Sequence, residues 1–202
     1  MCHNCGALER HRLLWLYLTR GPNIFDQPTK LLHFAPEPIF FRRFSEADDI
    51  DYYPCDLAPQ NLPASVRKMD ITDIQFDEES FDAVICNHVL EHVPDDHKAM
   101  SELHRVLRTG GWAILQVPIK SNLDHTIEDL SVTDPDERRR LYGQSDHVRL
   151  YGKDLEERLD RAGFDVKVEE IEQLFSPQEA GRFGLMADEV FYFCTKGDTA
   201  RY

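Results

Sequence analysis

The sequence lacks the usual marks of membrane and secreted proteins. No apolar run approaches the roughly 20 residues that span a bilayer, and the start, MCHNCGALERHR, lacks the basic-then-apolar order of a secretory signal. No internal repeat or low-complexity tract is present. With 202 residues, 42% hydrophobic and 30% charged, the chain has the composition of one folded soluble domain with a small appendage. We therefore expect a cytoplasmic protein.

Basic residues are scarce. The chain has 23 Lys and Arg against 37 Asp and Glu, a formal net charge of -14. Such a field repels phosphate backbones, which argues against a nucleic-acid partner. The one sizeable basic run, Arg138-Arg139-Arg140, follows acidic residues and is interpreted as a solvated helix face.

The cysteines are few and odd in number, five in all. Cys55, Cys86 and Cys194 fall in or beside expected strands, where cysteine behaves as a small buried hydrophobe. Cys2 and Cys5 form a lone C-x2-C, half of a four-ligand zinc site. Because the other half is missing, we predict no complete metal site, and reduced thiols are the alternative to a zinc half-site.

Short apolar segments alternate with helical patterns along most of the chain. Strands are expected at 30–34, 51–55, 66–71, 82–86 and 112–117, and helices at 8–18, 39–46 and 154–162, with a further helix that closes on Gly110-Gly111. Segments 164–171 and 189–195 supply two closing strands, antiparallel to each other. Strands and helices that alternate in this way predict an α/β fold with a parallel, doubly wound sheet.

The domain organisation follows from the same patterns. Residues 1–21 form an N-terminal CxxC segment and helix, and residues 22–202 form the main domain. Within it, about 119–152 is polar, acidic and weakly periodic, which favours a lid or insertion, with ordinary surface helix as the alternative.

Three carboxylates fall at or just after the ends of expected strands: Glu37, Asp56 and Asp70. A carboxylate after the second strand of a nucleotide-binding sheet can accept both ribose hydroxyls. Asp70 can accept a hydrogen bond from the exocyclic amine of adenine, while the backbone N–H of Ile71 donates to a ring nitrogen. Together these acids favour a nucleoside site.

Four stretches carry a family resemblance: FDAVICNHVLEHV at 81–93, SELHRVLRTGGWAILQVP at 101–118, Asp70-Ile71, and LYGKDLEERLDRAGF at 150–164. In these the chain resembles class I S-adenosylmethionine-dependent methyltransferases of the small-molecule type 11 family, over about residues 31–196. The resemblance implies a Rossmann-like seven-stranded sheet, mostly parallel, with the last strand antiparallel. It also implies S-adenosyl-L-methionine as cofactor and methyl transfer to an acceptor.

The resemblance assigns site residues as well. Asp56, beside Leu57, would bind the ribose, and Asp70 with Ile71 would hold adenine. Asn87 and His88, at the end of the fourth strand, would face the methionine half and the transferring methyl group.

The chain departs from the family pattern after its first strand. The family has an acid and a glycine-rich turn there, whereas this sequence reads HFAPEP over 33–38. Ala35 can replace the first glycine with modest steric loss, but proline removes a backbone donor. Glu37 can compensate by binding the ammonium group of the cofactor; loss of the cofactor, leaving an inactive protein, is the alternative.

A general base is needed when the acceptor loses a proton, as a hydroxyl does. His88 is the first candidate, with a structural hydrogen-bonding role as the alternative, and His147, in the expected lid, is the second. We expect a small-molecule acceptor, such as a saccharide or metabolite hydroxyl. A protein or other macromolecule and an inactive methyltransferase fold stay open as alternatives. The polar run 9–12 is interpreted as the solvent-facing side of its helix, with closure over the cofactor as the alternative.

Overall fold

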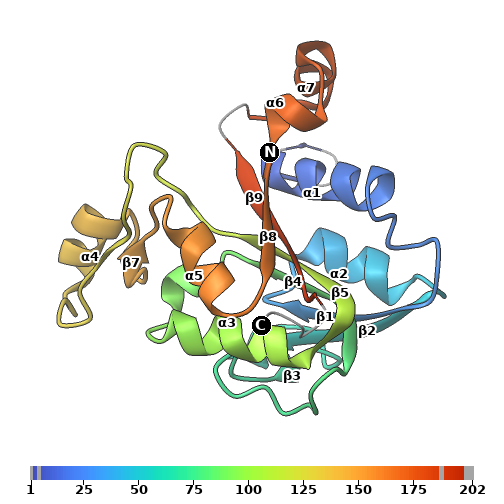
Figure 1. Ribbon diagram of the computed structural model, residues 1–202, viewed down its shortest axis with the longest axis horizontal. Helices are drawn as coiled ribbons and strands as arrows, with labels where there is room; N and C mark the ends of the chain where they lie inside the picture. Colours follow the sequence, from blue (N-terminus) through green and yellow to red (C-terminus); the bar gives the residue numbers. More distant parts are fainter. Residues whose placement is uncertain (1, 4–5, 187–188, 198–202) are drawn as a thin grey trace.

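A single large sheet organises the part of the chain that the computed structural model describes, residues 2–3, 6–186 and 189–197. Its strand order is β3-β2-β1-β4-β5-β9-β8 (Figure 1). The strands are β1 (Thr29–Phe34), β2 (Ile50–Asp56), β3 (Arg67–Lys68), β4 (Phe81–Asn87), β5 (Leu107–Gln116), β8 (Asp165–Glu170) and β9 (Val190–Thr195). Strand β9 runs in the opposite direction to the other six strands, and it pairs antiparallel with both β5 and β8. The predicted seven-stranded, mostly parallel, Rossmann-like α/β fold is confirmed, as is the antiparallel pairing of the two closing strands.

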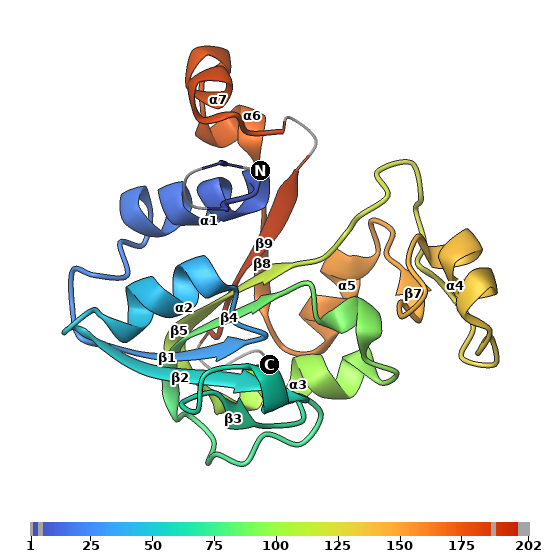
Figure 2. The same cartoon turned by 180° about the vertical axis from the view of Figure 1, so that it is seen from behind.

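Helices cover both faces of this sheet. The helices of the described residues are α1 (Glu9–Arg20), α2 (Pro38–Ser45), α3 (Asp96–Val106), α4 (Pro135–Tyr142), α5 (Leu155–Arg161), α6 (Ile171–Leu174) and α7 (Pro177–Phe183), with 3-10 turns η1 (Pro59–Asn61) and η2 (Leu90–His92). Helices α1 and α2 lie on one face of the sheet, and α3 and α5 lie on the other. In β4, Ala83 and Ile85 pack with α1 and α2, whereas Val84 and Cys86 pack with α3 and α5. This alternation follows from the two-residue period of a strand, and Figures 1 and 2 show the two helical layers from opposite sides.

Two predicted boundaries are wrong. Helix α3 ends at Val106, and Gly110 and Gly111 lie inside β5 instead of closing the helix. The glycine is required there for packing, since a Cβ on Gly111 would come within 2.9 Å of the Asp82 carbonyl oxygen. The third strand is also shorter than predicted, because the chain turns at Asp70, whose Oδ1 accepts hydrogen bonds from the backbone N–H and hydroxyl of Thr72 at 2.8 Å each.

Residues 119–152 leave the large sheet and form a small unit beside α5, seen at the left of Figure 1. Its β6 (Ile127–Glu128) and β7 (Arg149–Leu150) pair antiparallel, and α4 lies between them in sequence. Helix α4 begins at Asp134, whose carboxylate accepts from two backbone N–H groups, and ends at Gly143 with φ +91°. The interpretation of this unit as a lid, and the domain boundary at residue 21, stay predictions.

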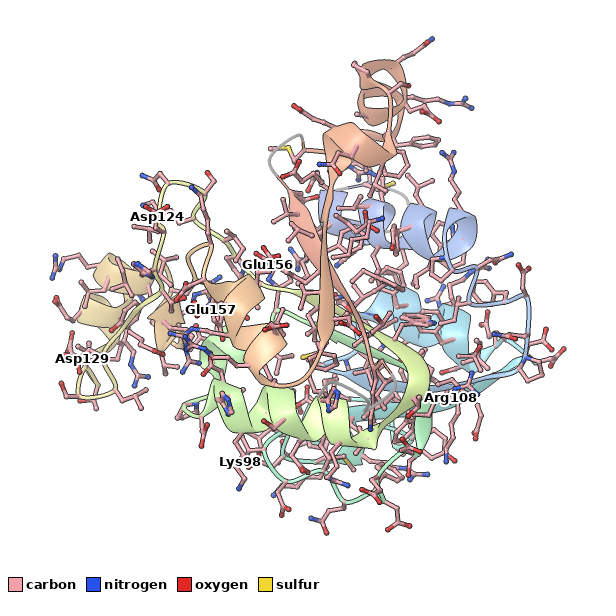
Figure 3. The ribbon with its side chains drawn as sticks, in the orientation of Figure 1. Lys98, Arg108, Asp124, Asp129, Glu156 and Glu157 are labelled. Carbon is pink, nitrogen blue, oxygen red and sulfur yellow. The ribbon has the colours of Figure 1, made fainter. Side chains whose placement is uncertain are left out.

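The acidity of the sequence is displayed on the surface around α5. Asp124, Glu156 and Glu157 are exposed and line one shallow hollow, and Figure 3 shows their side chains directed outward. Within the described residues, no helix combines the length and apolar character needed to cross a membrane.

Candidate active site

The carboxyl ends of β1, β2 and β4 open into a cavity of about 720 Å³. Six of the residues predicted from the sequence line it: Ala35, Asp56, Leu57, Asp70, Ile71 and His88. Of the other two, Asn87 is buried directly before His88, and Glu37 is half-buried, two residues after Ala35. The structure therefore brings the predicted nucleoside-site residues together at one edge of the sheet, where open α/β sheets bind ligands.

Two carboxylates in this cavity are fixed by short local turns. Asp56 Oδ1 accepts the backbone N–H of Ala58 at 2.7 Å, and Asp70 Oδ1 accepts from Thr72 as described above. Within the described part of the chain, Oδ2 of each accepts no hydrogen bond. Each side chain is thus held by one oxygen and offers the other to donors such as ribose hydroxyls or an adenine amine.

Two non-glycine residues leave their strands in the left-handed region. Ala35 has φ +48° and His88 has φ +54°. Their backbone N–H groups donate to Cys55 and Gln116 carbonyls at 2.8 and 2.7 Å, so the neighbouring strands hold both turns. Such conformations cost on the order of 1–3 kcal/mol and gather at functional sites. Ala35 stands where the resemblance predicts a glycine, and its backbone adopts the left-handed conformation that glycine adopts without strain.

Glu37 begins α2 and points into a buried cluster of histidines. Its carboxylate lies 3.3 Å from His33 Nε2 and 3.9 Å from His11 Nε2. Burial alone would raise the pKa of Glu37, but the hydrogen bond and charge of His33 outweigh it and hold the pKa below its ordinary value. Glu37 is therefore an anion near neutral pH. His33 and His11 already lie beside this carboxylate, so they compete with the cofactor ammonium group that Glu37 is predicted to bind.

Helix α1 contributes to this cluster, which corrects one interpretation. His11 is only 9% exposed, so residues 9–12 are not simply a wet helix face. Leu13, Leu14 and Leu18 pack in the core with β-sheet residues, and this brings the start of the helix over the strand ends. His33, at the other side of Glu37, is fully buried.

His88 stands between two cavities. It lines the 720 Å³ cavity and also a second one of about 310 Å³, whose other walls include Arg10 and Gln116. Its Nδ1 lies 3.4 Å from Glu91 Oε1, and its buried Nε2 has no hydrogen-bond partner among the described residues. The position fits a group placed between a cofactor and an acceptor.

His147, the second candidate base, is buried behind this wall. Its Nδ1 lies 3.2 Å from the Tyr142 carbonyl oxygen, and its ring packs edge-on against His92 at 4.8 Å between centroids. His92 and Asp146, rather than His147, line the large cavity.

Sequence reasoning missed Arg149, which is 1% exposed. Its guanidinium donates to the carbonyl oxygens of Leu90 at 2.8 Å and Pro94 at 2.9 Å, to that of Val93, and to Glu128 Oε2 at 2.9 Å. It ties the segment around His147 to the turn that follows β4. No local pattern in SDHVRLY distinguishes this arginine from an exposed one.

The predicted cysteine environments are confirmed for Cys55, Cys86 and Cys194, which are buried free thiols. Burial raises the pKa of Cys55 to about 12, so it is not a nucleophile. The zinc half-site proposed for Cys2 and Cys5 lies partly outside the described residues, because Cys5 is not among them.

Comparisons with known proteins agree with this geometry. The family model Methyltransf_11, described as a methyltransferase domain, matches residues 41–115. Demethylmenaquinone methyltransferase of Clavibacter sepedonicus is 44% identical over 46 residues, which are 23% of this chain and 19% of that protein. The chain spans a quarter or less of the length of the curated relatives it matches.

Two solved structures show the same fold at low identity. Haemonchus contortus phosphoethanolamine N-methyltransferase 2, in complex with S-adenosyl-L-methionine, aligns with a TM-score of 0.60 at 18% identity, over 94% of this chain and 53% of that one. A SAM-dependent methyltransferase from Archaeoglobus fulgidus aligns with a TM-score of 0.59 at 16% identity, over 91% and 93%.

The strand order and these structural neighbours give the chain a class I methyltransferase fold. The match to the type 11 methyltransferase domain model spans residues 41–115, which include the cavity residues at the ends of β2 and β4.

Proposed function

We propose that this protein is an S-adenosylmethionine-dependent methyltransferase that acts on a small molecule, with a metabolite or saccharide hydroxyl as the accepting group. The observation that carries the proposal is the pair of anchored carboxylates, Asp56 and Asp70, in one cavity at the carboxyl ends of parallel strands. Two of the matched proteins are named as methyltransferases, which supports methyl transfer as the reaction.

The residues present fit the cofactor. The cavity of about 720 Å³ is within the range of roughly 300–1,000 Å³ typical of small-ligand sites. Buried Asn87 Oδ1 has no hydrogen-bond partner among the described residues. Because buried polar atoms are normally paired, this supports a ligand that donates to it, such as the methionine half of the cofactor. Asp56 beside Leu57 would hold the ribose, Asp70 and Ile71 the adenine, and Ala35, Glu37, Asn87 and His88 the methionine half.

When bound, the cofactor supplies a methyl group already activated by a sulfonium. The chain then has to hold the acceptor in line with that group and exclude water. His88 would take the proton of an acceptor hydroxyl through Nε2, while Glu91, 3.4 Å from its Nδ1, orients the ring and stabilises the charged form. In this proposal His147 is the second candidate base, acting from behind His92.

The second cavity supports a small acceptor. At about 310 Å³ it is at the lower end of the volumes of small-ligand sites, and His88 joins it to the larger cavity. The exposed acids around α5 argue against a nucleic-acid acceptor. A cytoplasmic location belongs to the same proposal, and so does a lid formed by about 119–152.

Calorimetric titration with S-adenosylhomocysteine tests cofactor binding. We expect saturable binding to the unaltered chain and, in Asp56→Ala, a loss of about 10- to 100-fold in affinity, because hydrogen bonds to a charged group contribute about 1.5–3 kcal/mol. Asp48→Ala is the matched control. Asp48 is exposed and lines a hollow at the opposite ends of the strands. The Asp48→Ala variant should therefore bind S-adenosylhomocysteine as tightly as the unaltered chain.

The possible results separate the alternatives. No heat and no thermal shift with the unaltered chain would contradict the enzyme reading and favour an inactive methyltransferase fold. Equal affinity of Asp56→Ala and the unaltered chain would show that the ribose assignment is wrong. If the cofactor binds but only protein substrates become methylated in a screen with labelled S-adenosylmethionine, the macromolecular alternative replaces the small acceptor.

A further inference from the structure

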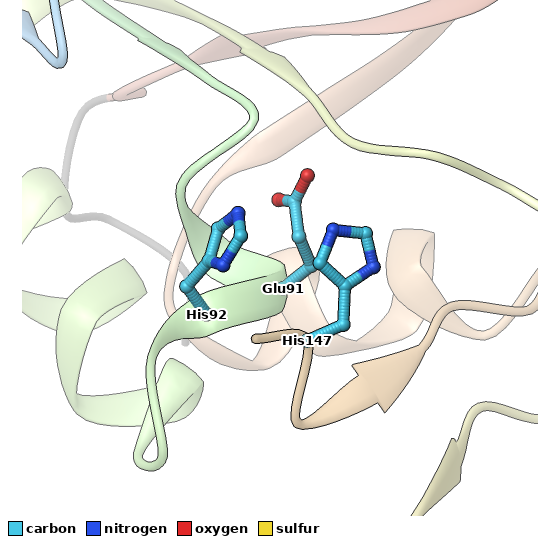
Figure 4. Close-up of side chains that lie close together, drawn as sticks. All are labelled: Glu91, His92 and His147. Carbon is cyan, nitrogen blue, oxygen red and sulfur yellow. The ribbon is translucent and has the colours of Figure 1, made fainter. Parts of the chain in front are cut away.

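Three side chains with metal-binding chemistry meet at the wall of the large cavity. Glu91 and His92 lie in the η2 turn after β4, and His147 comes from the segment before β7. Each places one possible ligand atom within 4.8 Å of the other two. Figure 4 shows the three side chains side by side. Glu91 and His147 are buried, whereas His92 is half-buried and lines the cavity.

Both imidazole rings are oriented by oxygen atoms. His147 Nδ1 lies 3.2 Å from the Tyr142 carbonyl oxygen. His92 Nδ1 lies 3.3 Å from the carbonyl oxygen of Asp146 and 3.4 Å from its Oδ2. Metal-ligating histidines almost always donate their other ring N–H to a carbonyl or carboxylate, which fixes the tautomer. This arrangement leaves Nε2 of each ring as the ligand atom.

Glu91 lacks a full set of partners. Its side chain is 2% exposed, and the buried Oε2 accepts no hydrogen bond within the described part of the chain. Its other oxygen lies 3.4 Å from His88 Nδ1. A buried carboxylate is costly unless it is paired or bound to a cation. A metal ion between Glu91 and the two histidines would remove that cost.

The two segments that carry these residues are held together by contacts of their own. The backbone N–H of Val148 donates to the Glu91 carbonyl at 2.9 Å, and Arg149 reaches the carbonyls of Leu90 and Pro94. The Tyr151 hydroxyl donates to Asp96 at 2.7 Å. The cluster is therefore assembled before any ion binds.

We propose that Glu91, His92 and His147 bind one divalent first-row transition metal ion. Two imidazoles and one carboxylate leave coordination positions open, a ligand set used for such metals. Ligand bonds of about 2.0–2.2 Å require the side chains to close in by roughly an ångström, which side-chain rotation supplies. Because His92 and Asp146 line the cavity, the open positions face it.

The use of this metal rests on the proposed function. At the cavity wall it would hold an oxygen of the acceptor and favour its deprotonated form, with His88 taking the proton. His147 as a metal ligand would then no longer be a candidate base. Metal binding itself does not depend on that function, so the two can be tested separately.

Calorimetry with CoCl₂ or ZnCl₂ on chelator-treated, full-length protein tests the site. Cys2→Ser and Cys5→Ser are introduced throughout, so that thiol binding does not contribute. We expect about one metal ion per chain, and a loss of at least 100-fold in affinity in Glu91→Gln and in His92→Gln. His97→Gln, an exposed histidine on α3, is the matched control and should bind as the parent does.

Thermal unfolding guards against misfolded variants. Both substitutions are close in size to the original residue and should melt near the parent without metal, while only the parent and His97→Gln gain stability when metal is added. The proposal is overturned if the thiol-free parent shows no saturable binding, or if Glu91→Gln and His92→Gln bind as tightly as the parent. Titrating S-adenosylhomocysteine into the same metal-free protein shows independently whether the cofactor site works.

Discussion

The site has two halves that are built differently. At the ends of β2 and β3, Asp56 and Asp70 sit in turns closed by contacts two residues along the chain. At the end of β4, Glu91 and His92 meet His147, about 55 residues further on. The first half is open to the large cavity, and most of the second is buried.

The difference indicates that the two halves of the site serve different tasks. Local turns with accessible carboxylates suit the binding of a nucleoside, which recurs across a whole class of enzymes. Buried groups joined by long-range contacts control charge and proton position, which differ from one acceptor to another. We therefore expect changes in the second half to alter folding, proton binding and metal binding, and changes in the first to alter cofactor affinity.

The largest effect should come from Arg149, which joins the second half together. Arg149→Met leaves three backbone carbonyls without their donor, and it leaves Arg158 as the cation that still pairs with Glu128 and Asp96. Removing one partner from a buried ion pair costs about 3–5 kcal/mol. We expect a loss of that size in the free energy of unfolding, measured by urea denaturation.

Arg140→Met is the control for this change. Arg140 lies on α4, is exposed and pairs only with Glu137 nearby, so its loss should cost less than about 1 kcal/mol. An equal loss in the free energy of unfolding for the two variants would contradict the view that buried long-range contacts of Arg149 hold the second half together.

A smaller effect concerns the pH dependence of stability. Burial lowers the pKa of His11, and the Glu37 carboxylate only partly offsets this. In the unfolded chain His11 takes up its proton near pH 6.5, so the unfolded state binds more protons as pH falls and stability decreases. His11→Gln should flatten the decline between pH 7 and 5, by less than about 1.4 kcal/mol per pH unit.

Some slope should persist in that variant, because burial also lowers the pKa of His104. The measurement is urea denaturation of the parent and of His11→Gln at several pH values. A variant His11→Gln with the parental slope would show that this histidine is not a buried neutral group.

The smallest effect is expected at Ala35. Glycine adopts its φ of +48° without steric cost, so Ala35→Gly should raise the free energy of unfolding by about 0.5 kcal/mol, since relief of strain slightly exceeds the added chain entropy. Ala58→Gly, at φ -133°, is the control and should lower it by about 0.4–1 kcal/mol. A loss of stability in both variants would mean that Ala35 carries no strain.

How far the sequence could be interpreted follows the same division. The sheet, its order of helices and strands, and the clustering of Asp56 and Asp70 were predictable, because they depend on hydrophobic periodicity and on residues next to strand ends. The end of α3 was misjudged because Gly110-Gly111 looks like a helix stop, yet it is needed where β5 passes close to Asp82. The burial of His11, the role of Arg149 and the meeting of Glu91 with His147 were not predictable. Each depends on contacts between distant segments that leave no local pattern.

A crystal structure of the protein with S-adenosylhomocysteine tests the central claim most directly. We predict that the ligand occupies the cavity at the ends of β1, β2 and β4, with its ribose on Asp56, its adenine beside Asp70 and Ile71, and its sulfur toward His88. A ligand bound elsewhere, or a cavity that stays empty at saturating ligand, would contradict the account.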